Sequence, residues 1–227
     1  MFAVRWKSRI IIQADHLRSS FTSFLTVTLK IPVKLHLFER SGNAYKLRLL
    51  LSMLDVAYDK VLLDPAKGDL RSPAFLKLNP RGQVPVLEDG DHVFWESTGA
   101  MVYLARKHGG EQWLPTDAAG MARVMQWMAF AQNEVLFGLQ WARAVMLKLR
   151  GGDIEEYRSY GRAGLAILEQ HLSDHRWLAL GRPTIADIAN YPYVSLAPEG
   201  GIPLEPYPSV VAWVKRVEAL PGWIRRV

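Results

Sequence analysis

The residue types that carry chemistry are unevenly represented in this chain of 227 residues. It contains no cysteine, which excludes disulfide bonds, a cysteine-based metal site and a cysteine nucleophile. Six histidines are present without an HExxH or similar grouping, and although His171 and His175 lie four positions apart, no third ligand is apparent. We therefore expect no metal site, and the remaining candidates are hydroxyl, amide and carboxyl side chains near two helix starts.

One pair of polar side chains lies where a helix is expected to begin. Glu96 and Ser97 open a helical pattern that runs to about His108. Free N–H groups and the positive end of the helix dipole favour a carboxylate at such a place. Ser97 is able to donate to that carboxylate, and Glu96 to accept from an ammonium group. The pair suits a ligand that carries both charges, and the alternative is a plain N-terminal acid with a serine cap.

A second polar pair, Ser41 and Asn43, follows a short apolar strand and has turn and N-cap character. Further along, Pro85 lies just inside another strand, where it cannot donate to the ladder. A cis Val84-Pro85 bond would turn the backbone and expose the N–H and C=O groups of Val84. The alternative for Pro85 is an ordinary edge-strand proline.

The elements that must position these residues alternate in type through the first part of the chain. Leucines at helical spacing mark the first helix, and Asp89-Gly90-Asp91 marks a hairpin turn. The predicted order is β-α-β-α-β-β-α, over residues 34–38, 43–56, 58–63, 73–78, 84–88, 92–95 and 96–108 in turn. Its opening β-α-β unit implies a parallel strand pair with a right-handed crossover.

From Asp117 onward there is no convincing strand, which predicts an all-α second part. Thr184-Ile185-Ala186-Asp187 has capping-box spacing, with Asp in place of the usual Glu or Gln, and we interpret Asp187 as structural. The predicted organisation is an extension over residues 1–32, an α/β domain over 33–110 and a helical domain over 117–227.

The formal charge of +6, with a pI near 9.6, is concentrated at the N-terminus. Residues 1–32 contain five basic residues and one acidic residue, a net +4, so the rest carries about +2. We expect this extension to be poorly ordered. It is a leader of the transit-peptide kind, a functional basic tail, or sequence read from a start codon upstream of the real one. A basic tail predicts salt-sensitive binding to nucleic acid or an anionic membrane. The +2 of the remainder implies neither partner.

Four motifs, in this order and spacing, resemble the soluble glutathione S-transferase family over roughly residues 34–226. They are Ser41-Gly42-Asn43-Ala44-Tyr45-Lys46-Leu47-Arg48, Asn79-Pro80-Arg81-Gly82-Gln83-Val84-Pro85-Val86-Leu87, Glu96-Ser97 and Thr184-Ile185-Ala186-Asp187. The resemblance implies a thioredoxin-like α/β domain that binds glutathione, followed by an all-α helical bundle that holds an electrophile. It also implies a cytoplasmic homodimer that uses glutathione as co-substrate, without a metal.

Within that family the chain resembles bacterial-style, serine-type members of the theta and zeta kind. The resemblance implies that Ser41 donates a hydrogen bond to the glutathione thiolate. Asn43 is a rival donor, because its amide is also able to donate to sulfur. Tyr45 lies within the helix pattern and is expected to be structural. The absence of cysteine removes the omega- and beta-like chemistry that forms a mixed disulfide with glutathione.

The remaining implied contacts to glutathione come from two loops. The backbone of Val84, beside a cis Pro85, pairs with the cysteinyl part as an added strand. Glu96 and Ser97 hold the γ-glutamyl end, and Gln83 donates to the glycyl end. Four aromatic residues have near-helical spacing in the second domain: Trp127, Phe130, Phe137 and Trp141. We expect most of them in the core and one or two beside the electrophile, which in the family lies between the two domains.

The leading hypothesis is therefore a glutathione transferase. Transfer, isomerisation and peroxide reduction all begin with the glutathione thiolate, and the motifs are compatible with each. The alternative is a non-catalytic glutathione-binding or protein-interaction module on the same fold, because a fold does not determine function.

Overall fold

The computed structural model describes residues 33–226, and the extension predicted over residues 1–32 lies outside the described residues. The first part of the described chain has the predicted β-α-β-α-β-β-α order. Its elements are β1 (Val33–Leu37), α1 (Gly42–Met53), β2 (Tyr58–Leu62), the 3₁₀ turns η1 (Pro65–Lys67) and η2 (Asp69–Arg71), α2 (Pro73–Leu78), β3 (Val86–Asp89), β4 (His92–Trp95), α3 (Ser97–Leu104) and the π-helical segment η3 (Ala105–Gly109).

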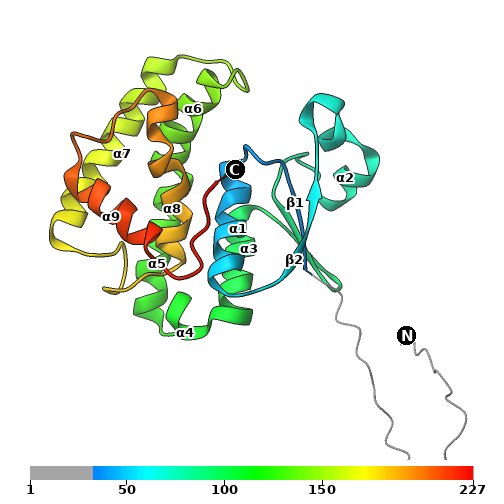
Figure 1. Ribbon diagram of the computed structural model, residues 1–227, viewed down its shortest axis with the longest axis horizontal. Coiled ribbons are helices and arrows are strands. Elements are labelled where there is room, and N and C mark those ends of the chain that lie inside the picture. The colour runs from blue at the N-terminus through cyan, green and yellow to red at the C-terminus, as the bar shows by residue number, and fades with distance from the viewer. Residues whose placement is uncertain (1–32, 227) are drawn as a thin grey trace, which may run out of the picture. The chain divides into compact units, whose positions relative to one another are not determined.

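The four strands form one sheet in the order β2-β1-β3-β4. β1 and β2 are parallel, whereas β3 is antiparallel to both β1 and β4. Val86 pairs with His36 on one side and with Trp95 on the other. The end of β1, the start of β3 and the end of β4 therefore meet at one edge of the sheet. α1 and α3 lie together on one face of the sheet, and α2 lies on the other face (Figure 1).

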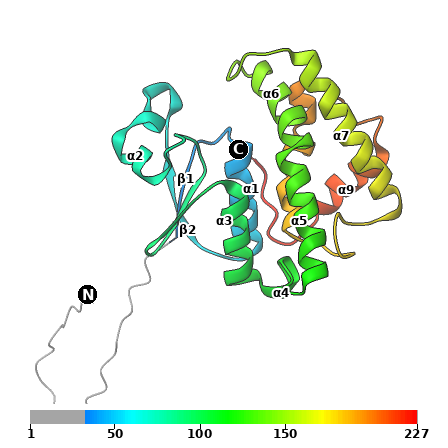
Figure 2. The same ribbon diagram turned by 180° about the vertical axis from the view of Figure 1, so that it is seen from behind.

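All regular elements from Gly110 to Glu218 are helical, as predicted for the second part. They are α4 (Gly110–Trp113), α5 (Ala118–Gln132), the π-helical segment η4 (Val135–Gln140), α6 (Trp141–Met146), α7 (Ile154–Asp174), α8 (Ile185–Ser195), the 3₁₀ turn η5 (Ala197–Gly200) and α9 (Pro208–Glu218). The long helix α7 packs against the η4 segment that follows α5 (Figure 2). Among residues 33–226, no helix has the length and apolar character needed to cross a membrane.

Local signals account for several element boundaries. Ser72 caps α2 by accepting from the Phe75 N–H at 3.2 Å, and Pro73 occupies the first turn, where its missing N–H costs nothing. The observed α2 matches the predicted range. The first helix ends earlier than predicted, at Met53, because Asp55 adopts a left-handed φ of 53° that a helix does not continue through.

Two boundaries near the sheet edge also differ from expectation. Pro85 lies just before β3 and not inside it, because the strand begins at Val86. The Val84-Pro85 peptide bond is cis, as predicted. The helix predicted over residues 96–108 changes to π-helical geometry at Ala105.

Asp187 organises the core of the helical part. Its carboxylate is fully buried and accepts from the Thr184 N–H at 2.9 Å, completing a capping box at the start of α8. The other oxygen accepts from the Leu178 N–H at 3.1 Å and from the Trp213 indole N–H at 2.9 Å. Burial raises the pKa of Asp187 to about 6, and these donors oppose the rise. The structural interpretation of this residue is consistent with every one of its contacts.

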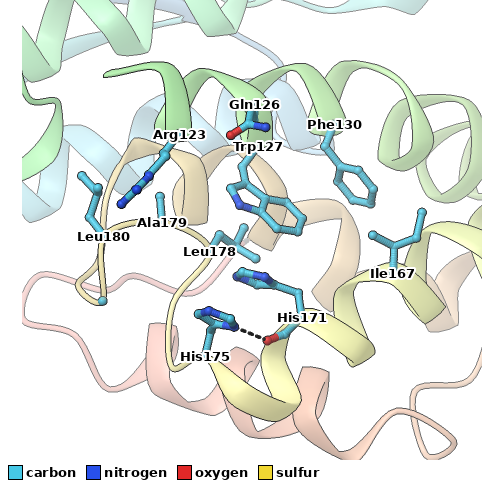
Figure 3. A pocket seen from close by; sticks show the side chains of 11 residues that line it. Arg123, Gln126, Trp127, Phe130, Ile167, His171, His175, Leu178, Ala179 and Leu180 are labelled. Carbon is cyan, nitrogen blue, oxygen red and sulfur yellow. Dashed lines mark hydrogen bonds between the residues drawn. The ribbon is translucent and has the colours of Figure 1, made fainter. Parts of the chain in front are cut away.

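The expectation that most of the four aromatic residues belong to the core holds for two of them, because Trp127 and Phe130 are partly buried and pack against the core whereas Phe137 and Trp141 do not. None of Trp127, Phe130, Phe137 and Trp141 is fully buried, and Phe137 is 39% exposed. Trp127 and Phe130 line one cavity against α7 (Figure 3), and Phe137 and Trp141 line another. The buried positions of α5, such as Val124 and Met128, occupy the adjacent strip of the helix. The spacing of apolar residues in the sequence does not distinguish the buried face of a helix from an adjacent face that lines a cavity.

Candidate functional site

The sheet edge described above gathers the three loops that carry the residues nominated for glutathione, whereas the four aromatic residues nominated for the electrophile lie in the helical part. Ser41 and Asn43 follow the end of β1, and the Val84-Pro85 bond with Gln83 precedes β3. Glu96 and Ser97 directly follow β4. The pairing of Val86 with both His36 and Trp95 is what brings these three loops to the same edge. The helices α1 and α3 both begin at this edge.

Ser41 is the N-cap of α1 and is only 8% exposed. Its hydroxyl oxygen accepts a hydrogen bond from the Ala44 N–H at 3.2 Å. Among residues 33–226, no acceptor takes the hydroxyl hydrogen of Ser41. A capping serine whose hydrogen is unused is able to donate to an anion at the helix N-terminus, where the helix dipole also favours negative charge.

Asn43 lies in the first turn of α1 and is half-buried. Its side-chain oxygen is buried without a hydrogen-bond partner within the described chain. The turn is packed closely against α8, because a Cβ added at Gly42 would lie 2.5 Å from the Tyr193 ring. Glycine is therefore required at position 42, and the backbone around Ser41 has little room to move.

The loop before the cis proline is held by Asn79, which is 2% exposed. Its amide nitrogen donates to the Gln83 carbonyl at 2.6 Å, and its side-chain oxygen accepts from the Arg81 N–H at 3.0 Å. Gly82 has a φ of +60°, which the turn requires. No hydrogen bond within residues 33–226 engages the N–H or carbonyl of Val84. That backbone is available to an added strand, and the side chain of Gln83 is exposed beside it.

Glu96 is the N-cap of α3 and has a positive φ of 76°, a conformation that non-glycine residues rarely adopt. Its side chain makes no capping hydrogen bond and instead forms an ion pair with Arg81. Ser97 is the first residue of α3 and is 3% exposed. The sequence interpretation gave Arg81 no role, although it stands within the motif that contains Gln83. The pair joins the loop before β3 to the start of α3.

A buried arginine of the helical part also supports the Ser41 loop. Arg143 of α6 donates through Nη1 to the carbonyl of Arg40, the residue before Ser41, at 3.3 Å. Its Nε donates to Glu199 at 2.6 Å, and Arg226 contacts the other oxygen of Glu199 at 2.5 Å. Sequence reasoning missed this cluster because its members lie far apart in the chain. The cluster connects the helical part to the turn that presents Ser41.

Lys46, also in α1, is fully buried and its ammonium group has no hydrogen-bond partner in the described chain. The nitrogen lies 5.2 Å from the centre of the Tyr193 ring. Burial lowers the pKa of Lys46 to about 7. The hydrophobic packing of α1 against α8 therefore encloses a group that is only partly charged at neutral pH.

The two cavities of the helical part are separate from this sheet edge, because neither is lined by a residue of the α/β domain. Figure 3 shows the larger one, where the imidazole rings of His171 and His175 stack 4.2 Å apart below Trp127. His171 is also in contact with Trp127, at 4.6 Å between ring centres. Within residues 33–226, no group of three or more His, Cys, Asp or Glu side chains is arranged to hold a metal ion.

Two family models match the chain. The glutathione S-transferase N-terminal domain matches residues 33–106, and the glutathione S-transferase C-terminal domain matches residues 158–221. The chain is 30% identical to a protein named glutathione S-transferase 2 from Anopheles gambiae, over 80% of this chain and 88% of that protein.

Solved structures agree in fold. A glutathione S-transferase from Pseudomonas fluorescens superposes with a TM-score of 0.81 at 34% identity, over 86% of this chain and 98% of the other. The glutathione transferase URE2P8 from Phanerochaete chrysosporium, solved with oxidized glutathione, has a TM-score of 0.74 at 28% identity, over 84% and 90% of the two chains.

Proposed function

The chain belongs to the glutathione S-transferase family, and from that premise we propose that it is a serine-type glutathione transferase in which Ser41 stabilises the glutathione thiolate. The observation that carries the proposal is the capping geometry of Ser41. Its oxygen is engaged by the Ala44 N–H, while its hydrogen has no acceptor among the described residues. This donor stands at the N-terminus of α1, where the dipole adds to the same stabilisation.

The energy required of this arrangement is modest. A free thiol titrates near 8.5, so at neutral pH only a few per cent is thiolate. Lowering that pKa by roughly two units needs about 2.7 kcal/mol of preferential stabilisation of the thiolate. A hydrogen bond to a charged acceptor contributes about 1.5–3 kcal/mol, and a helix terminus adds up to about 1 kcal/mol. The two together are sufficient.

The reaction then needs no base on the protein. The thiol proton leaves to solvent as glutathione binds, and the thiolate sulfur attacks an electrophilic carbon. A sulfur–carbon bond forms, and in a substitution the leaving group departs with its electron pair. The protein's task is to bind glutathione, hold its sulfur at the N-terminus of α1 and stabilise its charge. In this respect the chain resembles the theta and zeta classes.

The proposed glutathione site uses both remaining loops. The free N–H and carbonyl of Val84 pair with the cysteinyl backbone, and the cis Pro85 presents them. Glu96, already paired with Arg81, accepts from the γ-glutamyl ammonium, and Ser97 with the α3 N-terminus takes the carboxylate. Gln83, exposed at the end of the loop, donates to the glycyl carboxylate.

Asn43 remains the second candidate for the thiolate donor. Its side-chain oxygen is the buried, unpartnered atom, which leaves the amide nitrogen as the group able to reach a ligand. The oxygen and the nitrogen of an asparagine amide are distinguished by their hydrogen-bond partners. An Asn43 amide whose nitrogen donates to a ligand is compatible with the orientation in which its oxygen is buried. We rank Ser41 first because a hydroxyl that caps the helix is held in place by the cap itself.

The proposal includes a cytoplasmic homodimer. On β4, Val93 and Trp95 project to the same side and are 41% and 43% exposed, whereas Phe94 between them packs on Tyr103 at 4.2 Å. Two large apolar side chains exposed on an edge strand favour burial against a second copy. Sedimentation of the wild type and of Val93→Lys tests this, because the charged variant should shift the protein toward monomer.

The deciding experiment is conjugation of glutathione to a generic aryl halide by the wild type and by Ser41→Ala. Calorimetry with glutathione accompanies it, so that binding and turnover are measured separately. We expect the variant to bind glutathione and to lose most of its rate at neutral pH. Unchanged activity with an unchanged pH profile would remove Ser41 from the role. Tight binding without turnover of several electrophile classes by the wild type would favour the non-catalytic alternative.

A further inference from the structure

A second cavity of about 490 Å³ lies in the helical part, away from the sheet edge that carries Ser41. Its walls come from η4, the start of α6 and the first turns of α7. The lining includes four aromatic and two acidic residues: Phe137, Trp141, Tyr157, Tyr160, Glu134 and Glu156. We call it the aromatic–acidic cavity. Its volume falls in the range of small-molecule sites.

The backbone brings these side chains together through a contact between two glycines. A Cβ added at Gly138 of η4 would lie 2.3 Å from the backbone nitrogen of Gly161 in α7, so neither position tolerates a larger residue without displacement. The two helices therefore approach closely at this point, and the large side chains on either side of it form walls. The helix is π-helical here, a local geometry that often accompanies functional sites.

The aromatic rings meet nearly at right angles. Phe137 and Trp141 have ring centres 4.4 Å apart with an interplanar angle of 86°, and Trp141 and Tyr157 are 5.3 Å apart at 74°. Perpendicular rings present their negative faces in different directions around one space. Aromatic ring faces are the groups that recognise a quaternary ammonium ligand in aromatic cages.

Among the residues that line the cavity, only Glu134 and Glu156 carry a charged side chain. The carboxylates of Glu134 and Glu156 make no ion pair or hydrogen bond with any other residue of the described chain. The neighbouring Glu155 is different, because Arg158 neutralises it at 2.5 Å. Two uncompensated carboxylates beside aromatic walls repel anions and attract cations.

The chain itself places a cation on these rings. The guanidinium carbon of Arg150, in the loop between α6 and α7, lies 3.6 Å from the centre of the Trp141 ring and 5.6 Å from that of Tyr157. Arg150 is not among the residues that line the cavity. A cation therefore already stacks on the Trp141 ring, and the cavity adds the rings of Phe137 and Tyr160 together with the two carboxylates.

We propose that the aromatic–acidic cavity binds a small organic cation with a quaternary ammonium head, at a site separate from the glutathione site. A quaternary ammonium group has no hydrogen to donate, so ring faces and long-range attraction to carboxylates are its main sources of affinity. A primary ammonium or a metal ion would need oxygen ligands at close range. The proposal is independent of which residue activates glutathione.

Choline is the probe, and its uncharged isostere 3,3-dimethylbutan-1-ol is the control ligand of the same shape. Isothermal titration calorimetry of the full chain should give a choline Kd on the order of 1 mM or tighter, and binding of the isostere at least about tenfold weaker. The chosen variants, Phe137→Ala and Glu156→Gln, both change exposed side chains and leave the core intact. Each should weaken choline binding by about tenfold, whereas the neighbouring Glu155→Gln should not.

The proposal is overturned by equal binding of choline and its isostere, which would mean apolar contact without charge recognition. Choline binding that none of the cavity variants weakens would also overturn it. Absence of saturable choline binding below about 10 mM is a third contrary result. If Phe137→Ala then dissociates a dimer in sedimentation, the rings belong to an interface between two copies. Glutathione conjugation by Glu156→Gln should match the wild type, and circular dichroism of both variants verifies folding.

Discussion

The hydroxyl of Ser41 performs two separable tasks, and substitutions at this position distinguish them. As an N-cap its oxygen accepts from the Ala44 N–H, and as a donor its free hydrogen is proposed to contact the thiolate. Ser41→Ala removes both functions and Ser41→Thr retains both. Ser41→Gly removes the donor but costs the cap only a few tenths of a kcal/mol. The three variants together separate helix stability from thiol activation.

The expected magnitudes follow from these contacts. Loss of the cap in Ser41→Ala should lower the free energy of unfolding by about 1 kcal/mol. Loss of a hydrogen bond to a charged sulfur should cost about 1.5–3 kcal/mol, which raises the pKa of bound glutathione by about one to two units. Below that pKa, kcat/KM should fall by about 10- to 100-fold in both the alanine and the glycine variants.

The assay is the pH profile of conjugation together with ultraviolet titration of the bound thiolate. The wild-type rate should reach its plateau at lower pH than that of either variant. At alkaline pH the difference should close, because bound glutathione is then fully ionised in the wild type and in each variant, and a thiolate of higher pKa is also intrinsically more nucleophilic. A profile that keeps its midpoint in both Ser41→Ala and Ser41→Gly would refute the reasoning, and a shift in Asn43→Ala would then assign the donor to Asn43.

Three further predictions concern binding and stability. Glu96→Gln should raise the Kd of glutathione by about tenfold in calorimetry while kcat at saturation is unchanged, since Glu96 is proposed to contact only the γ-glutamyl end; an unchanged Kd would contradict that contact. Burial lowers the pKa of Lys46 to about 7. Between that pH and about 10.5, Lys46 is protonated in the unfolded chain but neutral in the folded chain, so the free energy of unfolding rises with pH. Lys46→Met should therefore stabilise the protein by about 4 kcal/mol at pH 7 in denaturant unfolding, with the advantage vanishing near pH 10.5; a gain independent of pH would refute the burial argument. Asp187→Ala should destabilise the fold by at least about 3 kcal/mol, because the Trp213 indole and two backbone N–H groups lose their acceptor. Thermal unfolding of Glu205→Ala, at an exposed position, supplies the comparison.

Signals confined to a few adjacent residues predicted local structure well. The α2 helix follows from Ser72 and Pro73 at its start, and the capping box at Thr184 follows from the spacing to Asp187. These features depend on hydrogen bonds between residues at most three positions apart, so a short stretch of sequence is enough to predict them. The cis bond at Pro85 was predicted from the family motif around it.

Contacts between distant segments were not predictable in the same way. The ion pair of Glu96 with Arg81 and the hydrogen bond from Arg143 to the Arg40 carbonyl join residues whose proximity depends on how loops and domains pack. The residues adjacent to Arg81 and Arg143 in the sequence do not distinguish these two from the other arginines of the chain. The roles assigned to the glutathione contacts themselves stay predictions.

The sequence by itself determined the order of elements, the family and the set of candidate residues at the sheet edge, because hydrophobic period, caps and turn residues act over short distances. Only the tertiary structure decided what surrounds those residues. It buried Lys46 without a partner, left the hydrogen of Ser41 free and turned Phe137 and Trp141 outward into a cavity. Burial, charge balance and cavities are properties of packed surfaces, and a surface exists only once segments far apart in the chain have come together.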